Sequence, residues 1–87
     1  MSSYTLRYTA RAVRDIEQLS DAVKKRIGEA MLKIVDAPYA YLRKMVDCNL
    51  GTYRYRIGEY RVIVDIVGLD IVVLRVGHRR NIYRNLR

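Results

Sequence analysis

Several residue types are scarce or missing in this sequence of 87 residues. It has no tryptophan or phenylalanine, one proline and one cysteine. With Cys48 alone, an intrachain disulfide is impossible and a cysteine-based metal site is strongly disfavoured. No apolar run approaches the roughly 20 residues that span a bilayer, and the first residues lack the charged-then-apolar order of a signal peptide. These absences predict a cytoplasmic protein that does not use a membrane.

Acidic residues are also few. Nine Asp and Glu stand against 17 Lys and Arg, which gives a formal net charge of +8. Such a balance fits a polyanionic partner, such as nucleic acid, or an acidic protein. All lysines precede Gly51, and from there on every Lys or Arg position is an arginine. Because arginine presents a rigid fork that matches phosphate, the second half is the better candidate for anion recognition.

The first half of the chain predicts one strand and two helices. Residues 4–8 alternate modestly and begin with β-prone side chains, which favours a strand. Thr9 and Ser20 each precede apolar residues at helical spacing, so each is predicted to cap a helix. The second helix is expected to end at Asp36-Ala37-Pro38. Residues 39–50 show no period and are expected to form a connecting loop.

The second half predicts three strands joined by two short turns. The strands are expected at about residues 52–57, 60–67 and 70–76, with turns at Gly58-Glu59 and near Gly68-Leu69. Short turns make these strands an antiparallel meander. With the N-terminal strand and the helical hairpin, the pattern predicts one α+β domain over residues 1–87, with the helices packed on one sheet face. The last residues, 79–87, are expected to form a short tail or helical turn.

The first predicted hairpin carries arginines at alternating positions. In a strand, Tyr53, Tyr55 and Ile57 share one face, so Arg54 and Arg56 share the other. A two-residue turn that begins with Gly58 places Arg56 opposite Arg61. Like charges directly opposite each other destabilise a sheet. An anionic ligand would resolve this conflict, which makes the face with these arginines the best functional candidate in the sequence.

Two segments carry a resemblance to a known family. They are Gly58-Glu59-Tyr60-Arg61-Val62-Ile63-Val64 and Gly77-His78-Arg79-Arg80-Asn81-Ile82-Tyr83-Arg84. Together, in a basic chain of this length, they resemble the RelE/ParE superfamily of toxin–antitoxin toxins. The resemblance implies a RelE-like fold and a metal-independent endoribonuclease that cuts mRNA in the ribosomal A site without a cofactor. It also implies that a cognate acidic antitoxin holds the toxin inactive.

The resemblance also implies which residues form the active site. The family's catalytic positions become Arg54, Arg56, Arg61, Arg79 and Tyr83. Three further arginines near the C-terminus, Arg75, Arg80 and Arg84, are predicted to bind RNA, although the sequence does not fix the face that Arg75 occupies. The chain departs from the pattern at Arg54 and Arg56, where the best-known RelE enzymes have lysine. His78 is a candidate general base by its ordinary pKa, but its place next to Arg79 favours a structural role.

Three functions remain open from the sequence. The RelE-like reading predicts attack of the ribose 2′-OH on the adjacent phosphate, with the arginines stabilising the extra negative charge. A ParE-like toxin would instead inhibit DNA gyrase and have no nuclease activity, and the lysine-to-arginine change keeps this alternative open. A non-catalytic nucleic-acid-binding module would need only the basic sheet face.

Overall fold

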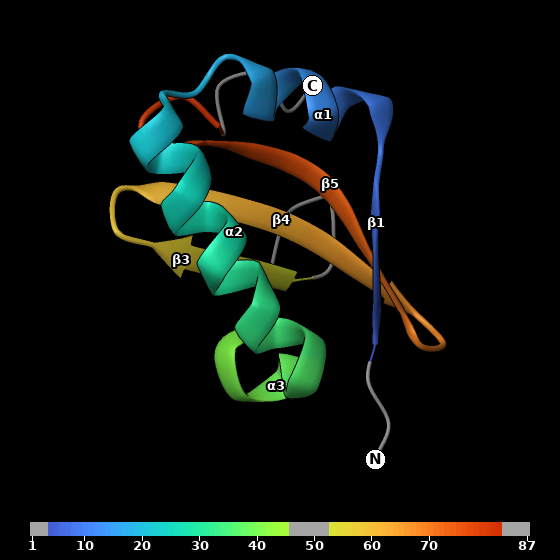
Figure 1. Cartoon of the computed structure of the whole chain (residues 1–87). Coiled ribbons are helices and arrows are strands. Elements are labelled where there is room, and N and C mark those ends of the chain that lie inside the picture. Colours follow the sequence, from blue (N-terminus) through green and yellow to red (C-terminus); the bar gives the residue numbers. More distant parts are fainter. Residues whose placement is uncertain (1–3, 46–52, 83–87) are drawn as a thin grey trace.

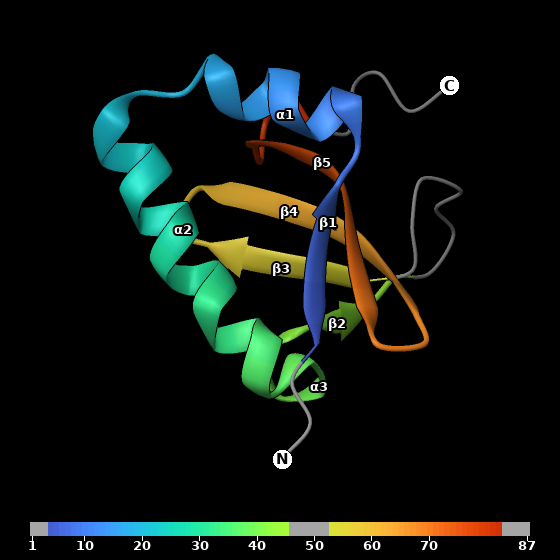
Figure 2. The same cartoon turned by 45° about the vertical axis from the view of Figure 1, so that its right-hand side comes forward.

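The centre of the structure is a five-stranded sheet whose strands lie in the order β1-β5-β4-β3-β2 (Figures 1 and 2). The computed structural model describes residues 4–45 and 53–82. Its elements are β1 (Thr5–Tyr8), α1 (Ala10–Glu17), α2 (Asp21–Asp36), α3 (Pro38–Tyr41), β2 (Arg43–Lys44), β3 (Tyr53–Ile57), β4 (Tyr60–Val67) and β5 (Asp70–His78). The predicted α+β class and the antiparallel meander of β3, β4 and β5 are confirmed.

Strand β1 joins the sheet at its far edge and runs parallel to β5. Thr5 is the partner of Asp70, and Tyr8 is the partner of Val73. Past this point the chain leaves the sheet, and α1 lies beside the last part of β5 (Figure 1). The Thr9 backbone N–H donates to the Val73 carbonyl at 3.1 Å. The N-terminal strand is therefore held to the strand that the sequence places last.

Both predicted helix caps are present. The Thr9 hydroxyl accepts a hydrogen bond from the Ala12 N–H at 3.1 Å, and the Ser20 hydroxyl accepts one from the Val23 N–H at 3.3 Å. Each bond satisfies a backbone donor that the first helical turn leaves unpaired. The two helices of the predicted hairpin lie differently on the sheet. Figure 2 shows α1 at the end of β5 and α2 running along the sheet towards α3.

The prediction that residues 39–50 form only a loop is wrong for the described part of that segment. Pro38 begins the one-turn helix α3, where the absence of an N–H costs no hydrogen bond. Arg43 and Lys44 then form the two-residue strand β2, in which Arg43 is the partner of Arg54. Neither element is long enough to produce a helical or alternating period in the sequence.

The core lies between α2 and the sheet. Ile27, Met31 and Ile34 of α2 are at most 4% exposed, and they belong to one cluster with buried residues of β3, β4 and β5. Tyr55 is part of this cluster, and its hydroxyl donates to the Ala30 carbonyl at 3.0 Å. Burial raises the pKa of the Tyr55 phenol above its ordinary value, and the neighbouring Tyr41 adds to this effect. The packing fixes which face of β3 points away from α2.

Candidate functional site

The β3–β4 hairpin has the predicted register. Ile57 is the partner of Tyr60, Arg56 of Arg61, and Arg54 of Ile63. Gly58 begins the turn with a φ of 60°, a conformation that glycine adopts without a steric penalty. A side chain at this position would also collide with the guanidinium of Arg26, which reaches the turn from α2. Both the turn and the alternation therefore place the hairpin arginines on one face.

We call this surface the arginine face and define it by the cross-strand neighbours Arg43, Arg54, Arg56 and Arg61. Tyr55 points to the core from the opposite side of β3, so Arg54 and Arg56 point away from α2. Arg43 joins them because β2 pairs it directly with Arg54. Sequence reasoning missed Arg43, since nothing in a run without a period indicated that it would pair with β3. The face thus contains two like-charged cross-strand pairs, one between β2 and β3 and the other between β3 and β4.

The arginine face contains an unsatisfied donor and a pocket. The Arg54 Nε is buried and has no hydrogen-bond partner within residues 4–45 and 53–82. A pocket of about 460 Å³ lies beside it, and its lining residues are Ala40, Tyr41, Arg43, Arg54, Tyr55 and Arg56. An unpaired buried donor normally costs folding free energy. Its presence beside a cationic pocket fits a surface built for an external acceptor.

Arg61 is held close to the turn. One terminal nitrogen of its guanidinium, Nη1, donates to the Gly58 carbonyl at 3.1 Å and to the Tyr60 carbonyl at 3.0 Å. Its cross-strand neighbour on the other side is Gly77, which has no side chain to cover it. The guanidinium is therefore preorganised by the backbone of the turn.

Arg79 reaches the same turn from the end of β5. Its backbone N–H donates to the Glu59 carbonyl at 2.7 Å, and its guanidinium Nε lies 2.8 Å from the Glu59 carboxylate. The structure thus brings Arg79 together with the hairpin that carries Arg56 and Arg61, as the sequence predicted. Arg80 is exposed in the turn that follows β5. Tyr83 and Arg84, the other predicted site residues of this segment, lie outside the described residues.

The turn after β5 folds back on the sheet. The backbone N–H groups of Asn81 and Ile82 both donate to the His78 carbonyl at 2.9 Å. Ile82 is 1% exposed, and its Cβ would lie 3.5 Å from a Cβ at Gly77. Ile82 therefore packs against Gly77, the cross-strand partner of Arg61, and this packing fixes the segment that carries Arg79.

His78 lies on the other side of β5 from Gly77. Its imidazole packs edge-on against its cross-strand partner Tyr60, with ring centroids 5.4 Å apart. Its Nδ1 accepts the backbone N–H of Arg80 at 3.1 Å. Both contacts shape the turn, so they support the structural role that the sequence favoured.

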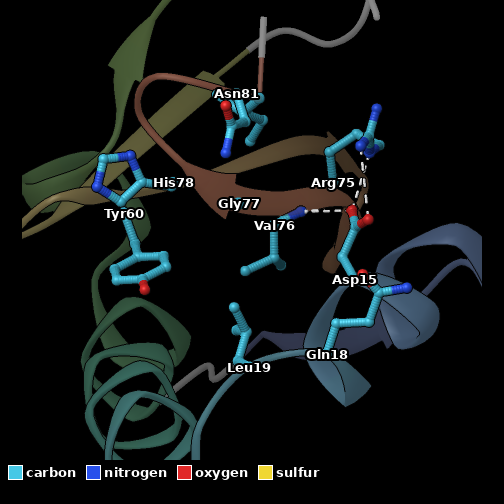
Figure 3. Close-up of a pocket in the computed structure, with 10 residues that line it drawn as sticks. Asp15, Gln18, Leu19, Tyr60, Arg75, Val76, Gly77, His78 and Asn81 are labelled. Atoms are coloured by element: carbon cyan, nitrogen blue, oxygen red, sulfur yellow. Dashed lines mark hydrogen bonds and ion pairs between the residues drawn. The ribbon is translucent and has the colours of Figure 1, made fainter. Parts of the chain in front are cut away.

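Arg75 forms part of an ion pair that anchors α1. Its Nε lies 2.8 Å from Asp15 Oδ2, and the Val76 N–H donates to the same oxygen at 3.0 Å (Figure 3). Both side chains are mostly buried, with 12% and 14% exposed. Asp15 lines a pocket of about 320 Å³ in which Leu19 and Val76 face each other, with Tyr60 and His78 at one side (Figure 3). RNA binding by Arg75 stays a prediction, and the guanidinium already has an acceptor.

The described residues contain neither a cluster of metal-ligating side chains nor a membrane-spanning helix. Within residues 4–45 and 53–82, no three His, Cys, Asp or Glu side chains gather closely enough to hold a metal ion. No helix in the same part of the chain is long and apolar enough to cross a membrane.

Comparison with known proteins identifies the family. Residues 6–83 match the family model described as the ParE toxin of the type II toxin–antitoxin system parDE. The chain is also 32% identical over 84 residues to the toxin RelG of Mycobacterium tuberculosis, an alignment that covers 93% of this chain and 97% of RelG. This chain belongs to the RelE/ParE superfamily of type II toxin–antitoxin toxins. The resemblance carried by its two motifs is confirmed.

Solved structures of RelE-type proteins share the fold of this toxin. The RelBE2 toxin–antitoxin complex of Mycobacterium tuberculosis contains a chain that matches with a TM-score of 0.81 at 29% identity, covering 88% of this chain and 99% of that one. The archaeal RelE–RelB complex from Pyrococcus horikoshii matches with a TM-score of 0.72 at 22% identity, covering 91% and 98%. The second likeness concerns the fold alone.

Proposed function

We propose that this toxin is a metal-independent endoribonuclease that cleaves mRNA in the A site of the ribosome. The observation that carries the proposal is the cross-strand pair of Arg56 and Arg61. Two guanidinium groups opposite each other on a sheet repel, and a phosphate bound between them removes that repulsion. Arg43 and Arg54 repeat the arrangement one row along the sheet. A row of paired arginines fits the spaced phosphates of a single strand.

The proposed reaction uses the RNA's own nucleophile. The ribose 2′-oxygen attacks the adjacent phosphorus, and the bond from phosphorus to the 5′-oxygen breaks. The 2′-OH loses its proton to solvent water, the 5′-oxygen takes a proton from solvent water, and the products are a 2′,3′-cyclic phosphate and a 5′-OH. Arg54, Arg56 and Arg61 stabilise the extra charge on the phosphoryl oxygens, and one preorganised donor contributes on the order of 3 kcal/mol.

Arg79 and Tyr83 complete the proposed site. Arg79 donates a hydrogen bond to the leaving 5′-oxygen. It does not act as a base, because a guanidinium is not deprotonated in proteins. Tyr83 stacks on a base or orients the 2′-OH. Arg75, Arg80 and Arg84 add RNA contacts outside the reacting phosphate.

The proposed partner in the resting state is a cognate acidic antitoxin. The matched Mycobacterium tuberculosis structure is a toxin–antitoxin complex. A net charge of +8 favours an acidic segment that covers the arginine face. The place of action is the cytoplasm, where ribosomes and antitoxin are found.

A ParE-like inhibitor of DNA gyrase is the second candidate. It is favoured by the description of the family model, which names the ParE toxin, and by Arg54 and Arg56 at positions where the best-known RelE enzymes have lysine. Such a toxin would act on gyrase and leave mRNA intact. A non-catalytic RNA-binding module would do neither.

One assay separates these functions. The purified toxin is added to ribosomes translating a defined mRNA, and the new 5′ ends are mapped by primer extension. We expect cuts in phase with codons, with 5′-OH ends. In parallel, the toxin is incubated with gyrase and plasmid DNA. DNA breaks without mRNA cuts would replace the proposal with gyrase inhibition, and ribosome binding with neither product would identify a passive binding module.

A further inference from the structure

Arg79 is attached to Glu59 in two different ways. The backbone bond from the Arg79 N–H to the Glu59 carbonyl is 2.7 Å long and does not depend on either side chain. The second link is the 2.8 Å ion pair between the Arg79 Nε and the Glu59 carboxylate. The backbone bond keeps Arg79 beside the turn, and the guanidinium is free to change its acceptor without moving the main chain.

The ion pair itself is easily exchanged. Arg79 is 49% exposed and Glu59 is 61% exposed at the side chain. Removing an exposed ion pair of this kind changes a folding or binding equilibrium constant by only about two- to fivefold, because water competes for both charged groups. A phosphate offers the same guanidinium a charge-assisted acceptor of higher charge and matched geometry. Replacing the carboxylate with a phosphate therefore meets little resistance.

Glu59 is also an acidic residue in an otherwise basic segment. It is the only acid between Tyr53 and Val64, a stretch that contributes three arginines to the arginine face. No ion pair involving Glu59 other than that with Arg79 occurs in residues 4–45 and 53–82. The carboxylate thus neutralises one cation of the candidate site and contributes little to the fold.

We propose that Glu59 is the resident counter-anion of Arg79. In the free toxin its carboxylate occupies the place that an RNA phosphate takes in the complex, and the phosphate displaces it on binding. The inference rests on the proposed function in so far as the incoming anion is RNA. Glu59 is a positioning residue: it keeps the Arg79 guanidinium at the turn before RNA arrives and lowers RNA affinity by competing for it.

The test is a binding measurement that does not depend on cleavage. A short single-stranded RNA with 2′-O-methyl groups throughout cannot be cut, and its binding to the free toxin is followed by fluorescence anisotropy. Glu59→Gln keeps the shape and the hydrogen-bond acceptor but removes the charge. We expect this variant to bind the RNA about two- to fivefold more tightly than the wild type. In an Arg79→Ala background the same substitution should give a clearly smaller gain.

The chain offers a matched control for loss of an acid. Asp70 pairs with Arg7 at 3.0 Å in another exposed ion pair, at the opposite end of β4 from the arginine face. Asp70→Asn should leave RNA affinity unchanged. The side-chain Nε–H resonance of Arg79 provides a direct readout, because RNA should shift it strongly in the wild type.

Three results would overturn the inference. They are weaker or unchanged binding by Glu59→Gln, an equal gain with and without Arg79, and a gain of the same size from Asp70→Asn. The proposed nuclease function is tested by a separate experiment: it is wrong if the wild type leaves mRNA uncut on translating ribosomes. Tighter RNA binding by Glu59→Gln would stand even then, whereas a wild type that binds no RNA would refute both.

Discussion

Arg56 and Arg61 are direct cross-strand partners, and one residue separates each of them from the Gly58-Glu59 turn that joins β3 to β4. The turn also holds Arg61 through the Gly58 carbonyl and Arg79 through the Glu59 carbonyl. A tight turn is thus the support for the cations of the site. Its geometry depends on the positive φ of Gly58, so the position of the guanidiniums is set by backbone and not by long side chains alone.

Substitution of Arg61 should impair cleavage without unfolding the protein. Its guanidinium is preorganised by two carbonyls of the hairpin, so Arg61→Ala should lower the rate of mRNA cleavage on ribosomes by roughly 100-fold or more. Lys24→Ala and Lys33→Ala on α2 are the controls and should leave the rate nearly unchanged. Equal losses at all three positions would indicate general attraction to the ribosome instead of an active centre.

His78 should contribute little to the pH dependence of cleavage. Its Nδ1 accepts the Arg80 N–H, and its ring packs on Tyr60. His78→Asn places an amide oxygen close to the position of Nδ1 and should keep the turn. We expect the same rate profile between about pH 6 and 8 as in the wild type. If instead the wild-type rate rises over this pH range and the variant rate does not, His78 is the base.

Asp15 should be important for stability. Asp15→Ala leaves both the mostly buried Arg75 and the Val76 N–H without an acceptor, which should lower the free energy of unfolding by about 2–4 kcal/mol. Urea titration measures this change. Asp70→Asn, which breaks an exposed pair, should cost at most about 1 kcal/mol. Similar losses for the two variants would contradict a special role for Asp15.

Tyr55 should make the fold sensitive to alkali. Burial raises the pKa of its phenol in the folded protein, so the folded state holds the proton more tightly than the unfolded state. This contribution is complete below the unfolded pKa of about 10 and is lost as the pH rises through the folded pKa. Urea titrations at pH 9 and 11 should show a smaller alkaline loss for Tyr55→Phe than for the wild type. Tyr39→Phe, at an exposed position, should behave as the wild type.

Local chemistry made much of this fold predictable. Thr9 and Ser20 cap their helices as the sequence indicates, and the glycine turn fixes the register that brings Arg56 opposite Arg61. These features depend on residues close together in the chain. The family resemblance then placed Arg79 near the same hairpin.

The features that escaped prediction depend on distant residues or very short elements. Asp15 and Arg75 are separated by 60 residues, so no local pattern reports their pairing. The sequence did not determine the sheet face on which Arg75 lies. The register between β4 and β5 shifts between Ile63 and Val64, and a one-residue shift moves every side chain beyond it to the opposite face. Arg43 was missed because two residues are too few to alternate.

The parallel pairing of β1 with β5 also governs when the toxin can acquire its shape during synthesis. Thr9 donates its hydroxyl to Leu74, 65 residues later in the chain, and β5 lies between β1 and β4 in the sheet. In a nascent chain that has not yet produced β5, strand β1 has no strand to pair with, and Arg79 is not yet placed beside the β3–β4 turn. Contacts of such long sequence separation form slowly. The ribosome that makes this protein therefore holds an incomplete sheet until β5 has left the exit tunnel.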